Sequence, residues 1–291
     1  MDKKIVIITG GNAGIGKASA MLLVRQGCHV IIACRNPDKG AEAVKKIKQR
    51  SQSGHIELMI VDMSLQASIT EFANNFNQKY DRLDVLIHNA ATFDITQKQA
   101  QYTREDVELI WATNHLGPVL LTELLMAALK NSARGRILTV SSKGLLAKPF
   151  MKIDLQDPEY RHKKFSVSNA YYQSKRAQVM YTYWLADKLR DANITANCIR
   201  VTAVKVDINK YPNISPMMKR LYALKSKSAL TPEEMAETYA YLATSDEVSG
   251  VSGKCYDENR KQVKSIKYTY NEDSITQVMN LTRGYFKQNI G

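Results

Sequence analysis

The sequence predicts an α/β fold, a doubly wound parallel sheet in a single domain with helices on both faces. Short runs rich in β-branched residues alternate along the 291-residue chain with longer segments of helical periodicity. A glycine-rich turn joins the first of these runs directly to the first helical segment. No internal repeat, low-complexity tract or Pro/Gly/Ser-rich linker interrupts the pattern, so we expect residues 1–291 to form one domain.

The β-branched runs are the expected strands: 4–9, 29–33, 56–61, 85–88, 136–141 and 195–200. Helices are expected at 15–27, 38–50, 66–80, 103–130 and 169–191, with a last helix at about 272–287. Two irregular insertions, at about 143–168 and 205–230, are of a length that usually carries function. Because such sheets bind ligands beyond the carboxyl ends of their strands, we expect the chemistry at those ends.

The composition is that of an ordinary globular protein. Apolar residues make up 44% and charged residues 24%, which excludes a disordered chain, a collagen and a small disulfide scaffold. No apolar run approaches the ~18 residues of a membrane span. The apolar run at 5–8 is too short for the core of a signal peptide. We therefore expect a cytoplasmic protein without a membrane span.

The distribution of charge argues against a nucleic-acid-binding surface, and the spacing of the cysteines and histidines argues against a metal site. The net charge of +13 and the pI of 9.4 invite a nucleic-acid partner. However, residues 1–150 hold 19 basic and 13 acidic side chains and residues 151–291 hold 22 and 15, so a solvated mixed surface is favoured and no nucleic acid is expected. No metal site is expected either, because the histidines and the four cysteines lack ligand spacing; the cysteines, expected to be reduced, are Cys28, Cys34, Cys198 and Cys255.

Residues 9–16 read T-G-G-N-A-G-I-G between the first strand and the first helix. Glycines permit a tight turn and a close approach of backbone to phosphate, and the helix N-terminus offers N–H groups and a positive dipole end. A glycine turn can be purely structural, but this strand-turn-helix context is the one that a dinucleotide site requires. The candidate dinucleotide contacts are Gly10, Asn12, Ala13, Gly14, Ile15 and Gly16.

The end of the second strand bears on the choice between NADP(H) and NAD(H). An acidic residue there holds the ribose 2′-hydroxyl of NAD, whereas arginine suits a 2′-phosphate. Arg35 occupies this place, with no Asp or Glu between His29 and Pro37, so NADP(H) is favoured over NAD(H). The alternative is that Arg35 is an exposed loop residue. Asp62, after the third strand, is placed either to meet the adenine edge or to cap the next helix.

Several short motifs follow one another in a characteristic order. The glycine turn has T-G-x-x-x-G-x-G spacing, and N-A-A (89–91), T-N-H-L-G (113–117), V-S-S (140–142) and Y-x-x-x-K (171–175) follow it. In these motifs the chain resembles the short-chain dehydrogenase/reductase family over nearly its whole length. Other details, such as S-G-K-C-Y at 252–256, resemble the retinol-dehydrogenase and protochlorophyllide-reductase-like branch. The resemblance implies a Rossmann fold and places Asn89 and Ala90 at the cofactor.

Tyr171 and Lys175 lie four residues apart on an expected helix, so they share one face. A free tyrosine has a pKa of ~10, and a nearby ammonium group lowers that pKa by favouring the phenolate. The pair can thus protonate a carbonyl oxygen or accept the proton in reverse. The resemblance further implies that Lys175 holds the nicotinamide ribose. Tyr172, three residues from Lys175, does not fit the pattern, and a solvated tyrosine-lysine pair is the structural alternative.

Ser142 and Asn114 complete the expected catalytic set. The resemblance makes Ser142 the residue that hydrogen-bonds the substrate oxygen, although a strand-ending turn also explains it. Pro118, four residues after Asn114, has no N–H, so the helix is expected to kink and leave the Asn114 carbonyl free for a water molecule. The resemblance implies that this water belongs to a proton relay, and an incidental kink is the alternative.

The chain departs from the family pattern after the sixth strand. The usual Pro-Gly is replaced by Val201 and Thr202, and a threonine near the nicotinamide is replaced by Val206, which leaves Val204 as the candidate contact to the carboxamide. The insertion at 143–168 and a lid loop at about 205–230 hold apolar residues that either wall a substrate pocket or form a satellite core. These residues are Leu145, Leu146, Phe150, Met151, Tyr160, Phe165, Tyr211, Pro212, Met217, Met218 and Tyr222.

The expected function is an NADPH-dependent oxidoreductase that reduces a mostly apolar carbonyl compound or oxidises the matching alcohol. The alternative is a non-catalytic NADP(H)-sensing or scaffold protein on the same fold, which the altered 201–206 segment motivates. The sequence leaves the substrate, the physiological direction and the stereochemistry of hydride transfer open. Homodimer and monomer are both compatible with the sequence.

Overall fold

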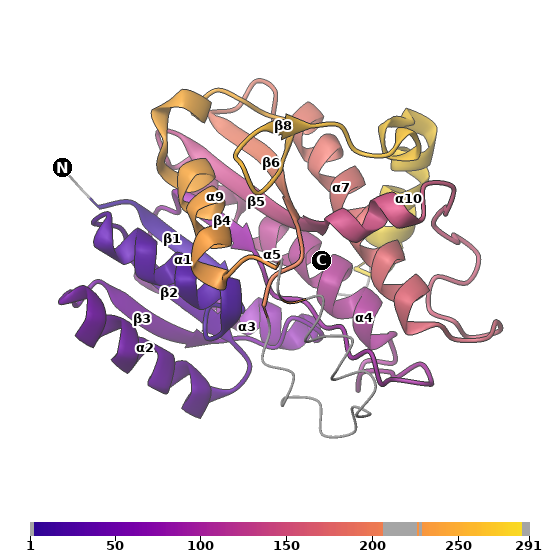
Figure 1. Ribbon diagram of the computed structural model, residues 1–291, viewed down its shortest axis with the longest axis horizontal. Helices are drawn as coiled ribbons and strands as arrows, with labels where there is room; N and C mark the ends of the chain where they lie inside the picture. Colours follow the sequence, from indigo (N-terminus) through magenta and orange to yellow (C-terminus); the bar gives the residue numbers. More distant parts are fainter. Residues whose placement is uncertain (1–2, 206–225, 227–228, 287–291) are drawn as a thin grey trace.

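The computed structural model describes residues 3–205, 226 and 229–286, and within them one eight-stranded sheet runs through the molecule (Figure 1). The strand order is β3-β2-β1-β4-β5-β6-β7-β8, all parallel except β8, which is antiparallel to β7. The strands are β1 (Ile5–Thr9), β2 (His29–Cys34), β3 (Ile56–Ile60), β4 (Val85–His88), β5 (Gly135–Ser142), β6 (Ile194–Val201), β7 (Cys255–Tyr256) and β8 (Gln262–Val263). This order confirms the predicted doubly wound α/β fold.

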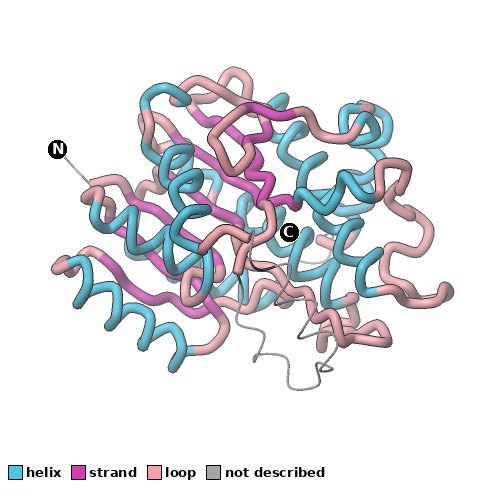
Figure 2. The backbone as a smooth tube through the Cα atoms, viewed as in Figure 1, coloured by secondary structure: helices cyan, strands magenta, loops and turns pink. Residues whose placement is uncertain are grey.

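Helices cover both faces of the sheet because the strand side chains alternate between two apolar layers (Figure 2). Val6 and Ile8 of β1 face the layer that contains α1, α2 and α9, whereas Ile7 faces the layer that contains α3, α5, α7 and α10. The long helices are α1 (Gly14–Arg25), α2 (Pro37–Ser51), α3 (Gln66–Lys79), α7 (Val167–Lys188), α9 (Pro232–Thr244) and α10 (Glu272–Gly284). The inner strands β1, β2, β4 and β5 are buried along most of their length, as a parallel sheet covered on both faces requires, whereas the edge strand β3 ends on the exposed Ile60.

Among the described residues, helix α9 and strands β7 and β8 are elements that the sequence analysis did not predict. Helix α9 begins at a capping box, in which Thr231 and Glu234 each bond the other's backbone N–H and Pro232 occupies the first turn. Strands β7 and β8 have two residues each, which is too short for a periodic pattern to predict.

The predicted continuous helix over 103–130 is wrong. The helical stretch begins at Leu109, because the carboxylate of Glu108 caps it by accepting from the N–H of Trp111 at 2.7 Å. Residues before it form a turn closed by the bridge between Tyr102 and Glu108. The helix then changes type along its length: α4 (Leu109–Trp111), the π-helix η1 (Ala112–Leu116), α5 (Gly117–Leu124) and α6 (Met126–Lys130).

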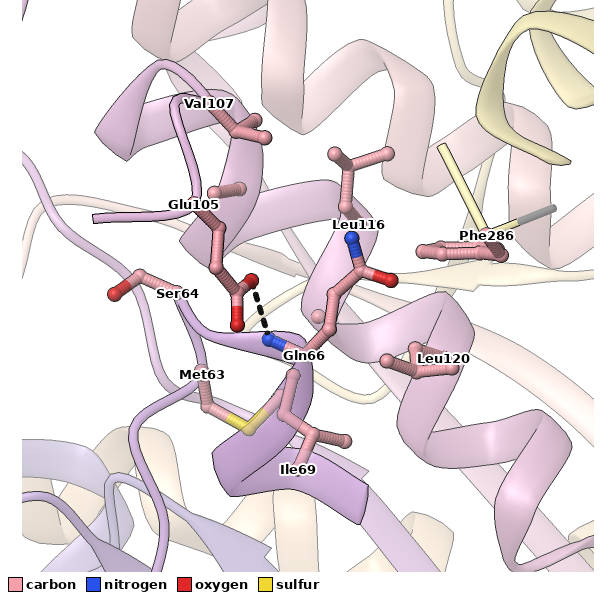
Figure 3. Close-up of a pocket in the computed structure, with 11 residues that line it drawn as sticks. Met63, Ser64, Gln66, Ile69, Glu105, Val107, Leu116, Leu120 and Phe286 are labelled. Carbon is pink, nitrogen blue, oxygen red and sulfur yellow. Dashed lines mark hydrogen bonds between the residues drawn. The ribbon is translucent and has the colours of Figure 1, made fainter. Parts of the chain in front are cut away.

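Close packing holds the start of α5 against the loop that leads into α3. A Cβ atom added to Gly117 would lie 2.2 Å from the carbonyl oxygen of Met63, so only glycine lets these backbones meet. Figure 3 shows the small cavity of about 10 Å³ beside this contact, with the Glu105 carboxylate bonded to the backbone N–H of Gln66 at 2.7 Å. Glu105 also accepts from Ala67, so a side chain from a distant loop caps α3.

The insertion at 143–168 is tied to α7. It opens with the 3₁₀-helix η2 (Lys143–Ala147) and continues as irregular backbone to the start of α7. The buried guanidinium of Arg176 donates to the carbonyls of Lys148 and Met151, and the amide of Gln173 bonds the backbone of Asp154 and Pro158. Most of the expected lid, at 206–225 and 227–228, lies outside the described residues.

Asn89 joins β4 to the glycine turn at the point where the strand order reverses. Its Nδ2 donates to the carbonyl oxygens of Thr9 and Gly10 at 2.9 and 3.3 Å, and its Oδ1 accepts from the hydroxyl of Tyr239 on α9 at 3.3 Å. A Cβ atom on Gly16 would lie 2.5 Å from both this Nδ2 and the Gly10 carbonyl oxygen. The turn is therefore packed around the Asn89 amide.

Replacing Gly16 with alanine should lower the free energy of unfolding by about 1–3 kcal/mol, because the added methyl group overpacks a site bounded by backbone. Gly284→Ala is the matched control, since a Cβ there meets nothing within 4 Å and alanine favours a helix by up to about 1 kcal/mol. Urea unfolding of both variants measures the difference. A Gly16→Ala protein as stable as the parent would show that the turn is not packed in this way.

Candidate active site

A cavity of about 770 Å³ opens at the carboxyl ends of the central strands. Its volume lies in the range of cofactor and drug-sized ligand pockets. The lining includes every predicted cofactor contact except Lys175: Gly10, Asn12, Ala13, Gly14, Ile15, Gly16, Arg35, Asp62, Asn89, Ala90 and Val204. The predicted cofactor contacts other than Lys175 are therefore gathered into one pocket by the fold, and the predicted catalytic residues Asn114, Ser142, Tyr171 and Lys175 are not part of its lining.

The glycine turn has the backbone form that a phosphate cradle needs. Gly10 and Gly14 have φ of +66° and +51°, a region that favours glycine, and a Cβ on Gly14 would meet nothing within 4 Å. Ala13 precedes the first turn of α1 and has no capping side chain, so the N-terminal N–H groups of α1 are left for a ligand. These features fit the pyrophosphate of a dinucleotide.

Two basic side chains line the other end of this cavity. The side chain of Arg35 is 73% exposed. Its guanidinium lies 3.7 Å from the carboxylate of Asp62. Lys39, which the sequence analysis did not single out, lines the same cavity from the first turn of α2, where Asn36 accepts its backbone N–H. Its position in the sequence could have indicated this, because Lys39 lies in the first turn of the helix that directly follows Arg35.

Asp62 is held in a local turn and does not cap α3. Its Oδ1 accepts from the backbone N–H of Ser64 at 2.9 Å and from the Ser64 hydroxyl at 2.6 Å. The N-terminal N–H groups of α3 are bonded by Glu105 instead. Of the two roles that the sequence allows Asp62, capping is wrong, and the carboxylate remains at the wall of the cavity.

Tyr171 and Lys175 share one face of α7, as their spacing predicts. The Nζ of Lys175 lies 5.9 Å from the centre of the Tyr171 ring and donates to the carbonyl oxygen of Val140 on β5 at 2.8 Å. The ammonium is buried, and burial lowers the pKa of Lys175 to about 8, against a smaller opposing effect of Cys198. An ammonium has three N–H donors, and the Val140 carbonyl takes one of them.

The two adjacent tyrosines point to different surroundings. The ring of Tyr171 stacks on Phe93 with 4.3 Å between centroids and is half-buried. The hydroxyl of Tyr172 faces Gly144, where an added Cβ would lie 2.5 Å from it. Tyr171 therefore lies with Lys175, and Tyr172 packs against the backbone of η2.

Asn114 lies in η1, so the disturbance expected from Pro118 takes the form of a π-turn, a feature frequent at functional sites. The side-chain amide accepts from the N–H of Thr92 at 2.8 Å and donates to the Thr92 carbonyl and to the hydroxyl of Ser174, each at 3.1 Å. Ser174 in turn donates to the carbonyl of Tyr171. These bonds link the π-helix to the turn of α7 that carries Tyr171, a connection that the sequence analysis missed.

Ser142 is the last residue of β5 and is half-buried, whereas Ser141 is buried and faces the backbone of Lys175. The Ser142 hydroxyl accepts from the N–H of Gly144 at 3.1 Å, which turns the chain into η2. Ser142 also borders a cavity of about 20 Å³ together with Cys255. The strand-ending turn is thus present, and it leaves the Ser142 hydroxyl at the carboxyl end of the sheet.

Some apolar side chains of the insertion at 143–168 are packed against the protein, and others are exposed to solvent. Leu145 packs beside Val179, and Tyr160 packs edge-to-face on Phe165. Phe150 is 93% exposed, and Leu146 is also exposed. Part of the insertion therefore forms a satellite core. The apolar residues named at 211–222, in the expected lid loop, lie outside the described residues.

Among the described residues, none of the helices combines the length and the apolar character needed to cross a bilayer. Within the same residues, no group of three or more His, Cys, Asp or Glu side chains could hold a metal ion.

Comparison with known proteins assigns a family. Residues 4–152 match the model described as short chain dehydrogenase, and residues 160–257 match the model described as enoyl-(acyl carrier protein) reductase. Human retinol dehydrogenase 13 is 35% identical over 87% of this chain and 76% of its own length. Human polyprenol dehydrogenase is 36% identical over 92% of this chain and 81% of its own.

Solved structures share the fold. An uncharacterised protein of Mycobacterium paratuberculosis aligns with a TM-score of 0.74 at 24% identity, covering 98% of this chain and 93% of that one. A short chain dehydrogenase of Shigella flexneri complexed with NADP aligns with a TM-score of 0.66 at 20% identity, covering 89% and 98%. With the family motifs gathered at one end of a doubly wound sheet, the chain belongs to the short-chain dehydrogenase family of nicotinamide-dependent oxidoreductases.

Proposed function

We propose that this protein is an NADP(H)-dependent oxidoreductase that reduces an apolar carbonyl compound or oxidises the corresponding alcohol. The observation that carries the proposal is the pairing of Tyr171 with the buried ammonium of Lys175 on α7, near the carboxyl end of β5. Burial of the Lys175 ammonium costs desolvation energy and lowers its pKa, and ionisable groups perturbed in this way cluster at functional sites.

Arg35 and Lys39 support the preference for NADP(H). Both line the cavity, and a 2′-phosphate between them would receive charge-assisted hydrogen bonds. Asp62, 3.7 Å from Arg35, lines the same cavity and is the residue expected at the adenine edge.

Side chains of this protein transfer the proton that accompanies the hydride. The nicotinamide cofactor supplies or accepts the hydride when bound. The Tyr171 hydroxyl donates a proton to the substrate oxygen, or accepts it in the oxidative direction. The positive charge of Lys175 stabilises the resulting phenolate, and the Ser142 hydroxyl orients the substrate oxygen. Asn114 holds the Tyr171 turn in place through Ser174.

The relatives support an apolar substrate. Retinol and polyprenol, which name the two human relatives, are both alcohols on long apolar chains. Phe93 places an apolar ring 4.3 Å from the ring of Tyr171, the proposed proton donor, so the surroundings of that hydroxyl are apolar on this side. We therefore expect an aldehyde or alcohol with a long hydrocarbon chain.

Tyr171→Phe should lower turnover of retinal, or of another long-chain aldehyde, by about 10²–10⁴-fold, because the proton donor is lost while the ring stack remains. Tyr172→Phe is the matched control and should keep near-parental turnover, since that hydroxyl faces Gly144. NADPH oxidation followed by absorbance measures both. Full turnover in Tyr171→Phe would contradict the assignment, and tight NADPH binding by the parent without turnover of any carbonyl would favour the sensor or scaffold alternative.

Arg35→Ala should weaken NADPH binding by about 10–100-fold, the value of one or two charge-assisted hydrogen bonds. NADH binding should stay unchanged, because NADH has no 2′-phosphate. Titration of nicotinamide fluorescence gives both dissociation constants, with Lys45→Ala on the exposed side of α2 as the control. Equal losses for the two cofactors would remove Arg35 from the choice between them.

Lys175 should make stability depend on pH in the alkaline range. Burial lowers its pKa from the ordinary 10.5 to about 8, so between these values the unfolded chain binds the proton that the folded chain has lost. The free energy of unfolding should therefore rise with pH from about 8 to 10.5, by up to about 3 kcal/mol relative to Lys175→Met. Urea unfolding at pH 8 and pH 10 tests this, and parallel pH profiles for parent and variant would refute it.

A further inference from the structure

Two cysteines that are 57 positions apart in the sequence are direct neighbours in the sheet. Cys198 on β6 and Cys255 on β7 are paired in the parallel register. Adjacent strands lie about 4.8 Å apart, inside the Cα–Cα range of about 4.4–6.8 Å that a disulfide spans. Both side chains belong to one apolar cluster beneath α7, with Leu145 and Val179, so their sulfur atoms lie on the same face of the sheet.

The surroundings distinguish the two thiols. Hydrogen bonding to Cys198 is the largest cause of a lowered pKa at Cys255, and a hydrogen bond from Tyr183 and the charge of Arg200 add to it against the effect of burial. The Tyr183 hydroxyl lies 3.4 Å from the Cys255 sulfur. The same thiol–thiol hydrogen bond, together with burial, raises the pKa of Cys198. Cys255 is therefore the better nucleophile, and Cys198 keeps its proton.

The two thiols also differ in their access to solvent. Cys255 is buried, with 4% of the residue exposed, but it lines an open cavity of about 690 Å³ whose lining includes Lys254, Lys264 and Lys267. Cys198 has no exposed surface and is not part of that lining. A small oxidant in this cavity therefore meets Cys255 first, with Cys198 next to the sulfur that has reacted.

We propose that Cys198 and Cys255 form a redox-active dithiol that hydrogen peroxide converts to a disulfide. The Cys255 thiolate attacks one peroxide oxygen and breaks the O–O bond, which yields a sulfenic acid and hydroxide. The Cys198 sulfur then attacks the Cys255 sulfur, and the sulfenic oxygen leaves as water with the Cys198 proton. The dithiol loses two electrons and the peroxide gains them, and an added dithiol reductant reverses the reaction.

The other two cysteines provide an internal control. Cys28, Cys34 and Cys255 are buried to a similar extent, and Cys34 also lines the cavity at the glycine turn, so exposure does not separate them. Burial raises the pKa of the Cys28 and Cys34 thiols, whereas the hydrogen bond to Cys198 lowers the pKa of Cys255. Cys34 lies opposite Ile60 in the sheet and Cys28 lies just before β2, so neither has a cysteine opposite it. They should therefore react more slowly and remain thiols while the pair on β6 and β7 is oxidised.

The test uses the full-length protein, treated with hydrogen peroxide, quenched with iodoacetamide and mapped by peptide mass spectrometry. A cross-linked Cys198–Cys255 peptide, two hydrogens lighter than the separate thiol peptides and removed by dithiothreitol, is expected. Cys255 should be consumed at least about tenfold faster than Cys28. This rate comparison within the parent protein requires no variant to fold.

Variants separate the two steps. Cys198→Ser, which keeps a hydrogen-bond donor beside Cys255, should stop at a Cys255 sulfenic acid that dimedone traps, whereas Cys28→Ala should form the disulfide at the parental rate. Peroxide treatment that leaves both Cys198 and Cys255 open to iodoacetamide would overturn the proposal, as would oxidation of Cys28 or Cys34 before Cys255. Both outcomes are independent of whether the protein turns over a carbonyl substrate.

Discussion

The side-chain amide of Asn89 joins β4 to the glycine turn and to α9, and the shape of the cofactor cavity depends on it. Parallel strands do not fix the loops at their ends, because ladder hydrogen bonds stop where the strands stop. Here one amide bonds two successive carbonyl oxygens, those of Thr9 and Gly10, and is itself held by Tyr239. The resemblance assigns Asn89 to the cofactor, and the structure adds that it fixes the backbone on which a cofactor would lie.

The fold was largely predictable because strand burial and helix periodicity leave clear patterns. Strand limits differ from the expected ones by a residue or so at each end, whereas β7 and β8 are too short to leave a pattern. Helix α9 could have been predicted from T-P-E-E at 231–234, which is a capping box with proline in the first turn. The helix expected at 103–130 was wrong because apolar periodicity does not reveal that Glu108 starts a new helix by bonding Trp111.

The candidate site was predictable where a motif fixes backbone shape and less so where long-range contacts decide. The glycine turn, Arg35 and the Tyr171–Lys175 pair follow from local spacing. Lys39 lines the same cavity from the first turn of α2, directly after Arg35, so its position in the sequence is a signal that motif matching alone does not use. The bond between Asn114 and Ser174 joins residues 60 positions apart and depends on how η1 lies on α7.

The π-turn in η1 has a consequence for how this chain tolerates changes of length. A π-turn contains one residue more than the α-turn that it replaces. The wider turn takes up that residue, so loss of one residue between Ala112 and Asn114 would restore a regular α-helix while Glu108 and α5 keep nearly the same relative orientation. The turn between them would tighten, and the backbone of Asn114 would move relative to Thr92 and Ser174, which its side chain now joins. Helix formation therefore does not need the extra residue, and its effect falls on the placement of Asn114.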